Sequence, residues 1–268
     1  MPKRTITALL LLLIGLPLLF MGGVFYLLFM GFLIVVSAWE YSLMFHGDKA
    51  RFARWMIAIG VSFIAISRYI YPDYSLAVLV LSILAALAFH LLDYERGNEH
   101  AAVEFNISVG ALLYLGWIGS YLLDLRQLPD GGWWVMFVLP CVWMTDTGAY
   151  LIGASYGKHK MTPRLSPKKS WEGFAAGAFS SMLIGGFLAF SYTKWGPLHI
   201  TIWQGAAFGL LVGLLTPLGD LGESMFKRQA GMKDSGTIFP GHGGAFDRID
   251  SWLWAGVLGF FFITWFVK

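Results

Sequence analysis

Nine apolar stretches recur along the chain, each long enough to cross a lipid bilayer. A membrane-spanning helix needs about 20 mostly apolar residues. The stretches lie at residues 5–21, 24–45, 53–71, 74–92, 105–123, 133–153, 172–193, 202–218 and 251–267. The chain has 57% hydrophobic and only 13% charged residues, a composition that excludes a water-soluble domain of this length. We therefore predict an all-α fold, a polytopic transmembrane helix bundle of about nine spans.

The first stretch could be a secretory signal, because it follows Lys3 and Arg4. No small-x-small cleavage site stands before the second stretch, so we expect the first to be retained. Repeats, low-complexity runs and flexible linkers are not evident in the sequence. We predict a single integral membrane domain over residues 1–268, with the active region at about 140–252.

The basic residues are distributed unevenly between the two sides of the predicted bundle. With the N-terminus inside, the inner connections receive Lys3, Arg4, Lys49, Arg51, Arg54, Arg96, Lys158, Lys160, Arg164, Lys168, Lys169, Lys227, Arg228, Lys233 and Arg248. The outer side receives Arg126, Lys194 and Lys268. The positive-inside rule then predicts a cytoplasmic N-terminus, an external C-terminus and residence in a bacterial inner membrane.

Small residues form a stripe along the eighth stretch. Gly205, Gly209 and Gly213 recur at four-residue spacing, which favours close packing of one helix against another. Such faces permit a homodimer without requiring one.

Charged side chains follow Pro217 with helical spacing. Asp220, Glu223, Ser224, Lys227 and Arg228 would lie along one helix face. A solvated helix end with internal ion pairs would explain this pattern equally well. Asp220 directly continues an apolar span, however, and an ionisable group at that depth is costly and therefore indicates function.

Two carboxylates stand at the start of the last stretch. Asp247 and Asp250 are three residues apart and flank Arg248. The helix dipole alone would favour one acidic residue there. Two carboxylates, together with Asp220, would instead supply the hard oxygen ligands that Mg²⁺ prefers, and nearby cations would neutralise phosphate oxygens.

A glycine-rich segment separates these two groups. It reads Ile238-Phe239-Pro240-Gly241-His242-Gly243-Gly244 and lacks the spacing of a Walker loop or a dinucleotide fingerprint. Its backbone N–H groups could bind an anion. His242 is a candidate general acid or base, although a histidine in such a turn serves as often as a hydrogen-bonding scaffold.

A second polar segment connects the sixth and seventh stretches. It contains Asp146-Thr147-Gly148-Ala149-Tyr150 and Ser166-Pro167-Lys168-Lys169-Ser170-Trp171-Glu172-Gly173. Cations ahead of a helix make an anion site, and Ser170 or Glu172 could cap that helix. Lysines that contact lipid headgroups would also fit this pattern.

The two segments together resemble the signature of CDP-diacylglycerol synthases, also called phosphatidate cytidylyltransferases. The resemblance is carried by Ser224-Met225-Phe226-Lys227-Arg228, Lys233-Asp234-Ser235-Gly236, Pro240-Gly241-His242-Gly243-Gly244 and Asp247-Arg248-Ile249-Asp250, and it extends to both motifs of the other segment. Ala245 departs from the family, which usually has a larger aliphatic residue there. The resemblance implies cytidylyl transfer from CTP to phosphatidic acid, with a divalent metal required.

The candidate site residues divide into three groups. The metal ligands would be Asp220, Asp247 and Asp250, holding Mg²⁺ and allowing a second cation. The substrate phosphates would be bound by Lys168, Lys169, Ser170, Gly243, Gly244 and Arg248. The residues assigned to catalysis are Ser224, Lys227, Arg228, Lys233, His242 and Asp146.

Other functions compete with this one. A relative acting on another lipid phosphate would share the same chemistry. A transporter would place its polar groups near the membrane midplane, whereas here they lie at span ends on one side. The Asp-Gly-x-x-Ala-Arg pattern of CDP-alcohol phosphotransferases is absent from the sequence. We expect CTP, phosphatidic acid and membrane lipids as partners, with no nucleic acid, and an active site facing the cytoplasm.

Overall fold

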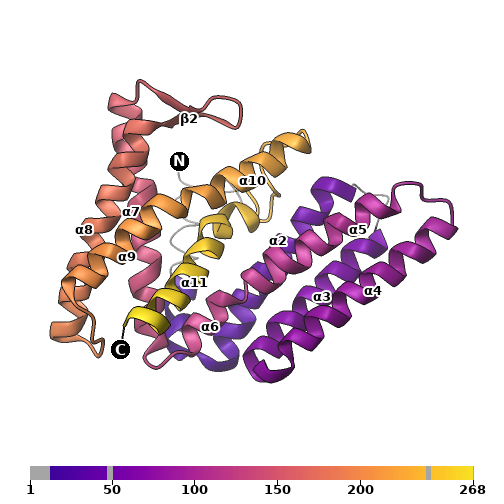
Figure 1. Ribbon diagram of the computed structural model, residues 1–268, viewed down its shortest axis with the longest axis horizontal. Coiled ribbons are helices and arrows are strands. Elements are labelled where there is room, and N and C mark those ends of the chain that lie inside the picture. The colour runs from indigo at the N-terminus through magenta and orange to yellow at the C-terminus, as the bar shows by residue number, and fades with distance from the viewer. Residues whose placement is uncertain (1–12, 47–50, 240–242, 268) are drawn as a thin grey trace. The chain divides into compact units, whose positions relative to one another are not determined.

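The computed structural model describes residues 13–46, 51–239 and 243–267, and helices dominate it (Figure 1). Within this part of the chain, eight helical segments are long and apolar enough to cross a membrane. They are Gly23–Phe45, Phe52–Ile70, Pro72–Glu95, Ala101–Gln127, Gly131–Tyr156, Trp171–Trp195, Ile202–Gln229 and Phe246–Phe266. These segments correspond to the last eight predicted stretches, so the polytopic all-α class is confirmed.

The first predicted stretch, 5–21, lies partly outside the described residues, and its described part, 13–21, is helical. The side of the membrane that each terminus faces stays a prediction.

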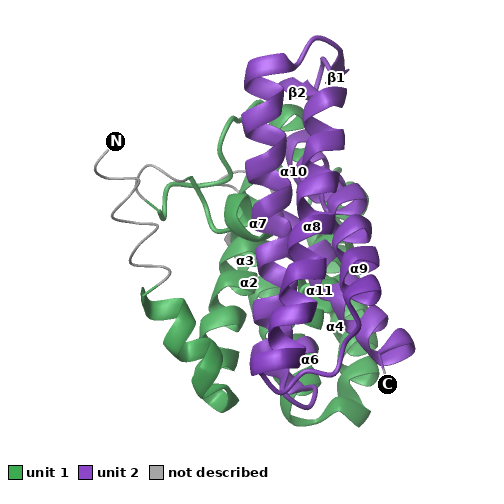
Figure 2. Cartoon of the chain, turned by 90° about the vertical axis from the view of Figure 1, so that its left-hand side faces the viewer, with its two compact units in different colours: residues 1–124, 226–249 green, residues 125–225, 250–268 purple. Residues whose placement is uncertain are grey.

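The chain divides into two compact units (Figure 2). Unit 1 comprises Met1–Asp124 and Phe226–Ile249, and unit 2 comprises Leu125–Met225 and Asp250–Lys268. Each unit therefore combines an early part of the chain with a later one. The expectation of a single membrane domain stays a prediction.

Unit 1 is built mainly from the N-terminal helices. They are α2 (Gly23–His46), α3 (Arg51–Ile70), the short η1 (Pro72–Tyr74), α4 (Ser75–Glu95), α5 (Ala101–Gly110), the π-helical η2 (Ala111–Ile118) and the start of α6 (Tyr121–Gln127). Helix α3 packs against α2, α4 and η2, and α4 packs against α5. The last residues of α10 (Pro217–Gln229) and the first of α11 (Phe246–Phe266) also belong to this unit.

Unit 1 contains an ion pair between a buried arginine and a largely buried aspartate. The Arg68 guanidinium pairs with the Asp124 carboxylate and lies 4.2 Å from the ring centroid of Trp117 and 4.0 Å from that of Tyr121. The Arg68 Nη1 also donates to the Trp117 carbonyl at 3.2 Å. Because a buried charge is tolerated only with such partners, this pair can remain inside an apolar bundle.

Unit 2 contains α7 (Gly131–Tyr156), α8 (Trp171–Trp195), α9 (Ile202–Leu215) and most of α10 and α11. Helix α8 packs against both α7 and α9 (Figure 1). Between α7 and α8, strands β1 (Lys160–Thr162) and β2 (Ser166–Ser170) form an antiparallel hairpin. The sequence analysis did not anticipate these strands. Their pairing satisfies backbone polar groups in a segment too polar to extend either span.

The predicted close packing of the small-residue stripe is confirmed within unit 2. A Cβ built on Gly209 would lie 2.8 Å from the Ser181 carbonyl carbon, and one on Gly213 would lie 2.5 Å from the Ala178 Cα. Gly205 approaches Gly185 in the same way, with 3.1 Å from its Cβ position to the Gly185 carbonyl carbon. Helices α8 and α9 thus meet backbone to backbone, a distance that only glycine allows.

Candidate functional site

A cavity of 540 Å³ opens in unit 2, where the end of α7, the hairpin, the start of α8 and the start of α10 meet. Its lining combines both segments that the sequence analysis singled out. The polar and charged residues of the lining are Thr145, Asp146, Tyr150, Lys160, Lys168, Lys169, Ser170 and Asp220. The lining has three lysines and two aspartates, and this excess of positive charge suits an anionic ligand of nucleotide or headgroup size.

The hairpin positions the cations of this cavity. Strand β2 carries Lys168 and Lys169 directly before α8, and the hydroxyl of Ser170 accepts a hydrogen bond from the Gly173 amide at 3.2 Å. Of the two predicted caps, Ser170 or Glu172, the structure shows Ser170 in this role. Lys169 forms an ion pair with Asp220, whose side chain is 36% exposed, so this ammonium lies beside a partly solvated carboxylate.

Three carboxylates of unit 2 converge near the cavity. One oxygen each from Asp220, Glu223 and Asp250 lies within 4.8 Å of the others. Helix α10 supplies the first two from adjacent positions of one face, and Gly219 lets that helix approach α11. A Cβ on Gly219 would lie 2.9 Å from the Trp254 ring. The three oxygens fit the donor set that Mg²⁺ prefers, which leaves room for water and phosphate.

The sequence analysis did not predict that Glu223 joins this cluster. Glu223 was placed on the polar face of this helix but was not assigned to metal, whereas the structure places it, 1% exposed, with Asp220 and Asp250. The spacing of three between Asp220 and Glu223 was the available signal.

Asp247 lies in unit 1 and is held by several donors. Its Oδ1 accepts from the Lys227 ammonium at 2.6 Å. Its Oδ2 accepts from the amides of Ser235 and Gly244 and from the Ser235 hydroxyl, each at 2.9 Å. Donors arranged in this way fix the orientation of a carboxylate and of the ammonium it pairs with.

The remaining candidates are described by their contacts and by their exposure. The Ser224 hydroxyl is 3.4 Å from the Asp220 Oδ1, and the Arg228 Nη1 donates to the Met232 carbonyl at 3.3 Å. Exposed side chains belong to Arg228, Lys233, Arg248 and Asp146, the last of which lines the cavity.

Two further candidates concern the glycine-rich segment. His242 lies outside the described residues. Gly243 has a φ of 80°, and its carbonyl accepts from the Phe239 amide at 3.0 Å, so these two described residues of the segment lie side by side.

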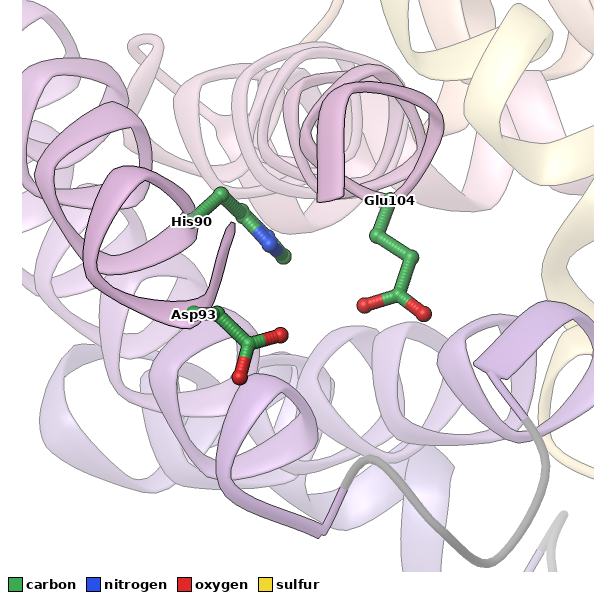
Figure 3. A group of neighbouring side chains, drawn as sticks. All are labelled: His90, Asp93 and Glu104. Atoms are coloured by element: carbon green, nitrogen blue, oxygen red, sulfur yellow. The ribbon is translucent and has the colours of Figure 1, made fainter. Parts of the chain in front are cut away.

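A second cluster of possible metal ligands lies in unit 1, at the turn between α4 and α5. His90, Asp93 and Glu104 point toward a common space (Figure 3), and one atom of each lies within 4.8 Å of the others. The Asn98 amide already donates to Asp93 at 2.5 Å and to Glu104 at 3.0 Å, and the His90 Nε2 is 2.9 Å from the Ser108 hydroxyl. Because these bonds account for the grouping, the cluster does not require a cation.

Comparison with known proteins gives a consistent result over nearly the whole chain. A family model described as "Cytidylyltransferase family" matches residues 2–266. The chain is 33% identical to the phosphatidate cytidylyltransferase of Staphylococcus aureus (strain COL) over 255 residues, which cover 94% of this chain and 95% of that protein. It is 36% identical to the phosphatidate cytidylyltransferase of Pseudomonas aeruginosa over 268 residues, which cover 98% and 96% of the two chains.

Proposed function

Because the chain belongs to the cytidylyltransferase family, we propose that it transfers a cytidylyl group from CTP to phosphatidic acid. The products are CDP-diacylglycerol and pyrophosphate. The observation that carries this proposal is that Asp220 belongs both to the cationic cavity and to the carboxylate cluster. A phosphate-binding surface and a metal-binding surface therefore adjoin within unit 2, which is what nucleotidyl transfer requires.

In the proposed reaction, a phosphate oxygen of phosphatidic acid attacks the α-phosphorus of CTP in line. A new P–O bond forms, the bond between the α-phosphorus and the bridging oxygen to the β-phosphorus breaks, and pyrophosphate leaves with that electron pair. The lipid phosphate is already anionic, so the protein need not supply a nucleophile. The protein positions two mutually repelling anions and neutralises their charge.

We assign the cation site to Asp220, Glu223 and Asp250, all of unit 2. Within unit 1, both Asp247 oxygens accept hydrogen bonds, and the expectation that Asp247 binds metal stays a prediction. Bound Mg²⁺ would stabilise charge on the phosphate oxygens during transfer. Lys168 and Lys169 bind phosphate in the cavity of unit 2. The Asp247 carboxylate holds the Lys227 ammonium in a fixed direction, which makes Lys227 the phosphate-binding cation of unit 1.

The distribution of basic residues supports a reaction at the cytoplasmic face of a bacterial inner membrane. Phosphatidic acid would then enter laterally from the inner leaflet. Membrane lipids would surround the bundle as its solvent. The small-residue faces of the helices are compatible with a homodimer.

The test is conversion of CTP labelled at the α-phosphate by the purified protein in detergent with phosphatidic acid. We expect labelled CDP-diacylglycerol in Mg²⁺, none in EDTA, and at least a hundredfold loss in Asp250→Asn and Asp247→Asn, as for lost transition-state contacts. Asp130→Asn is the matched control, because Asp130 is exposed in unit 2 with a φ of 56° that asparagine also adopts.

Two outcomes would contradict the proposal in different ways. Product formed only with another lipid phosphate would refute the substrate and keep the chemistry. Failure to convert CTP with any lipid phosphate, in a folded and monodisperse protein, would refute cytidylyl transfer and favour a binding or transport role.

A further inference from the structure

Helix α2 carries a carboxylate that the proposed reaction does not use. Glu40 lies inside the first described span of unit 1 and is only 4% exposed. A charged group at such a position is costly unless other groups bond to it, and it is usually functional. The N-terminal third of the chain thus contributes a polar group to a region where the sequence suggested only membrane topology.

The partners of Glu40 lie about 200 residues later in the chain but within the same unit. Its Oε1 accepts from the Ala245 amide at 3.1 Å, and its Oε2 accepts from the Phe246 amide at 3.0 Å. These amides begin α11, where backbone N–H groups have no partner inside the helix. Glu40 therefore caps α11 from another helix and fixes where α11 starts.

A serine connects Glu40 to Asp247. The Ser235 hydroxyl oxygen is 2.9 Å from the Glu40 Oε2 and 2.9 Å from the Asp247 Oδ2. A hydroxyl has one proton to donate, so the two carboxylates share a single donor. The Asp247 amide also donates to this hydroxyl, at 3.3 Å. A displacement of the Glu40 carboxylate would therefore change the hydrogen bonding of Asp247.

The surrounding backbone is shaped around the Glu40 carboxylate. A Cβ built on Gly244 would lie 2.5 Å from the Glu40 Cδ, and one on Gly236 would lie 2.8 Å from the same atom. Two glycines of the signature segment thus leave the space that this side chain fills. The Glu40 carboxylate therefore occupies a fitted binding site within unit 1.

We propose that Glu40 is a positioning residue for the transfer reaction. It fixes the start of α11 and, through Ser235, the carboxylate of Asp247, which in turn holds the Lys227 ammonium. Glu40 itself touches no substrate. This inference rests on the proposed function of Asp247 and Lys227.

The informative substitution is Glu40→Gln, because it keeps the size of the side chain. In the variant, one carboxylate oxygen becomes an NH₂ group, which cannot accept a hydrogen bond. This group faces the Ala245 amide in one orientation of the glutamine and the Phe246 amide in the other. At least one of these amides loses its acceptor. Hydrogen–deuterium exchange of a peptide covering residues 243–248 should therefore be faster in the variant than in the wild type.

Activity provides the second measurement. We expect Glu40→Gln to lower kcat/KM by about 10–100-fold, the loss usual for groups that orient metal-site or catalytic residues. In an Asp247→Asn background, the same substitution should lower kcat/KM by less than about threefold, because residues that act as a unit are not additive. Glu40→Asp keeps the charge but is shorter by one methylene, and it should restore part of the activity.

Asp124→Asn is the matched control, since it also removes an ion-paired, largely buried carboxylate from unit 1, with a side chain 14% exposed. Its partner is Arg68, so it should lower thermal stability without changing exchange at 243–248 or activity per folded molecule. Unchanged exchange and activity in Glu40→Gln, or effects equal to those of Asp124→Asn, would overturn the inference. An inactive wild-type protein would instead refute the proposed function, while the exchange rates would still decide whether Glu40 anchors α11.

Discussion

Replacement of Glu223 by glutamine should stabilise the metal-free protein and reduce the stability that it gains from Mg²⁺. The Asp220, Glu223 and Asp250 oxygens lie within 4.8 Å of one another, so three negative charges repel in the metal-free protein. Coulomb's law gives about 0.9 kcal/mol per pair at this distance in water and about 3.5 kcal/mol at an effective dielectric constant of 20. Asp220 is partly exposed and paired with Lys169, which favours the lower value.

Glu223→Gln removes two of the three repulsive pairs. We therefore expect the metal-free variant to be more stable than the wild type by about 2 kcal/mol, a rise in Tm of about 4–8 °C. Wild-type protein at a Mg²⁺ concentration of 100 Kd should gain about 2.7 kcal/mol. If the lost ligand weakens binding about tenfold, the variant should gain only about 1.4 kcal/mol at the same concentration.

The assay is thermal unfolding of the purified protein in detergent, in EDTA and across a Mg²⁺ titration. Asp130→Asn should match the wild type in both conditions. A variant that gains no stability in EDTA and responds to Mg²⁺ as the wild type does would refute the assignment of Glu223 as a ligand and the electrostatic reasoning behind it.

Three further predictions use other contacts. Lys227→Met should lower the free energy of unfolding by about 3–5 kcal/mol, because it leaves the buried Asp247 carboxylate without its ammonium. Thermal unfolding measures this loss, and an unchanged stability would show that the ion pair is solvated. Gly209→Ala should destabilise the protein by about 1–3 kcal/mol, because the added methyl group overpacks α8 against α9. Gly222→Ala, with open space around its Cβ position, should leave the stability unchanged. Equal unfolding temperatures of the two variants would contradict this prediction. Cys141 is fully buried, so a thiol reagent should modify it only as fast as the protein unfolds, and rapid labelling of the folded protein would contradict the packing.

The sequence predicted most of the fold because the bilayer allows few alternatives. Backbone groups in hydrocarbon must be satisfied within the chain, so apolar stretches of this length become helices. Helical spacing likewise placed Asp220 on the polar face of α10, where it lines the cavity. The Gly205, Gly209 and Gly213 stripe predicted close packing for the same geometric reason. In each case, the spacing of residues within one helix was sufficient for the prediction.

The contacts that the sequence did not predict join distant segments. Glu40 bonds to residues about 200 positions away, and no local pattern indicates which buried carboxylate will cap which helix. The pairing of Lys227 with Asp247 required the path of the chain between them. The β1–β2 hairpin was missed because its short strands lack the alternation that marks a strand.

The interleaving of the two units has a consequence for how the protein is made. Glu40 is synthesised 195 residues before Ser235. At about 5–20 residues per second, roughly 10–40 s separate the emergence of the two residues from the ribosome. During that interval, α2 must insert into the membrane with a carboxylate whose donors do not yet exist, so water, lipid headgroups or a proton must stabilise it. The final native contacts of α2 therefore form only when nearly the whole chain has been translated.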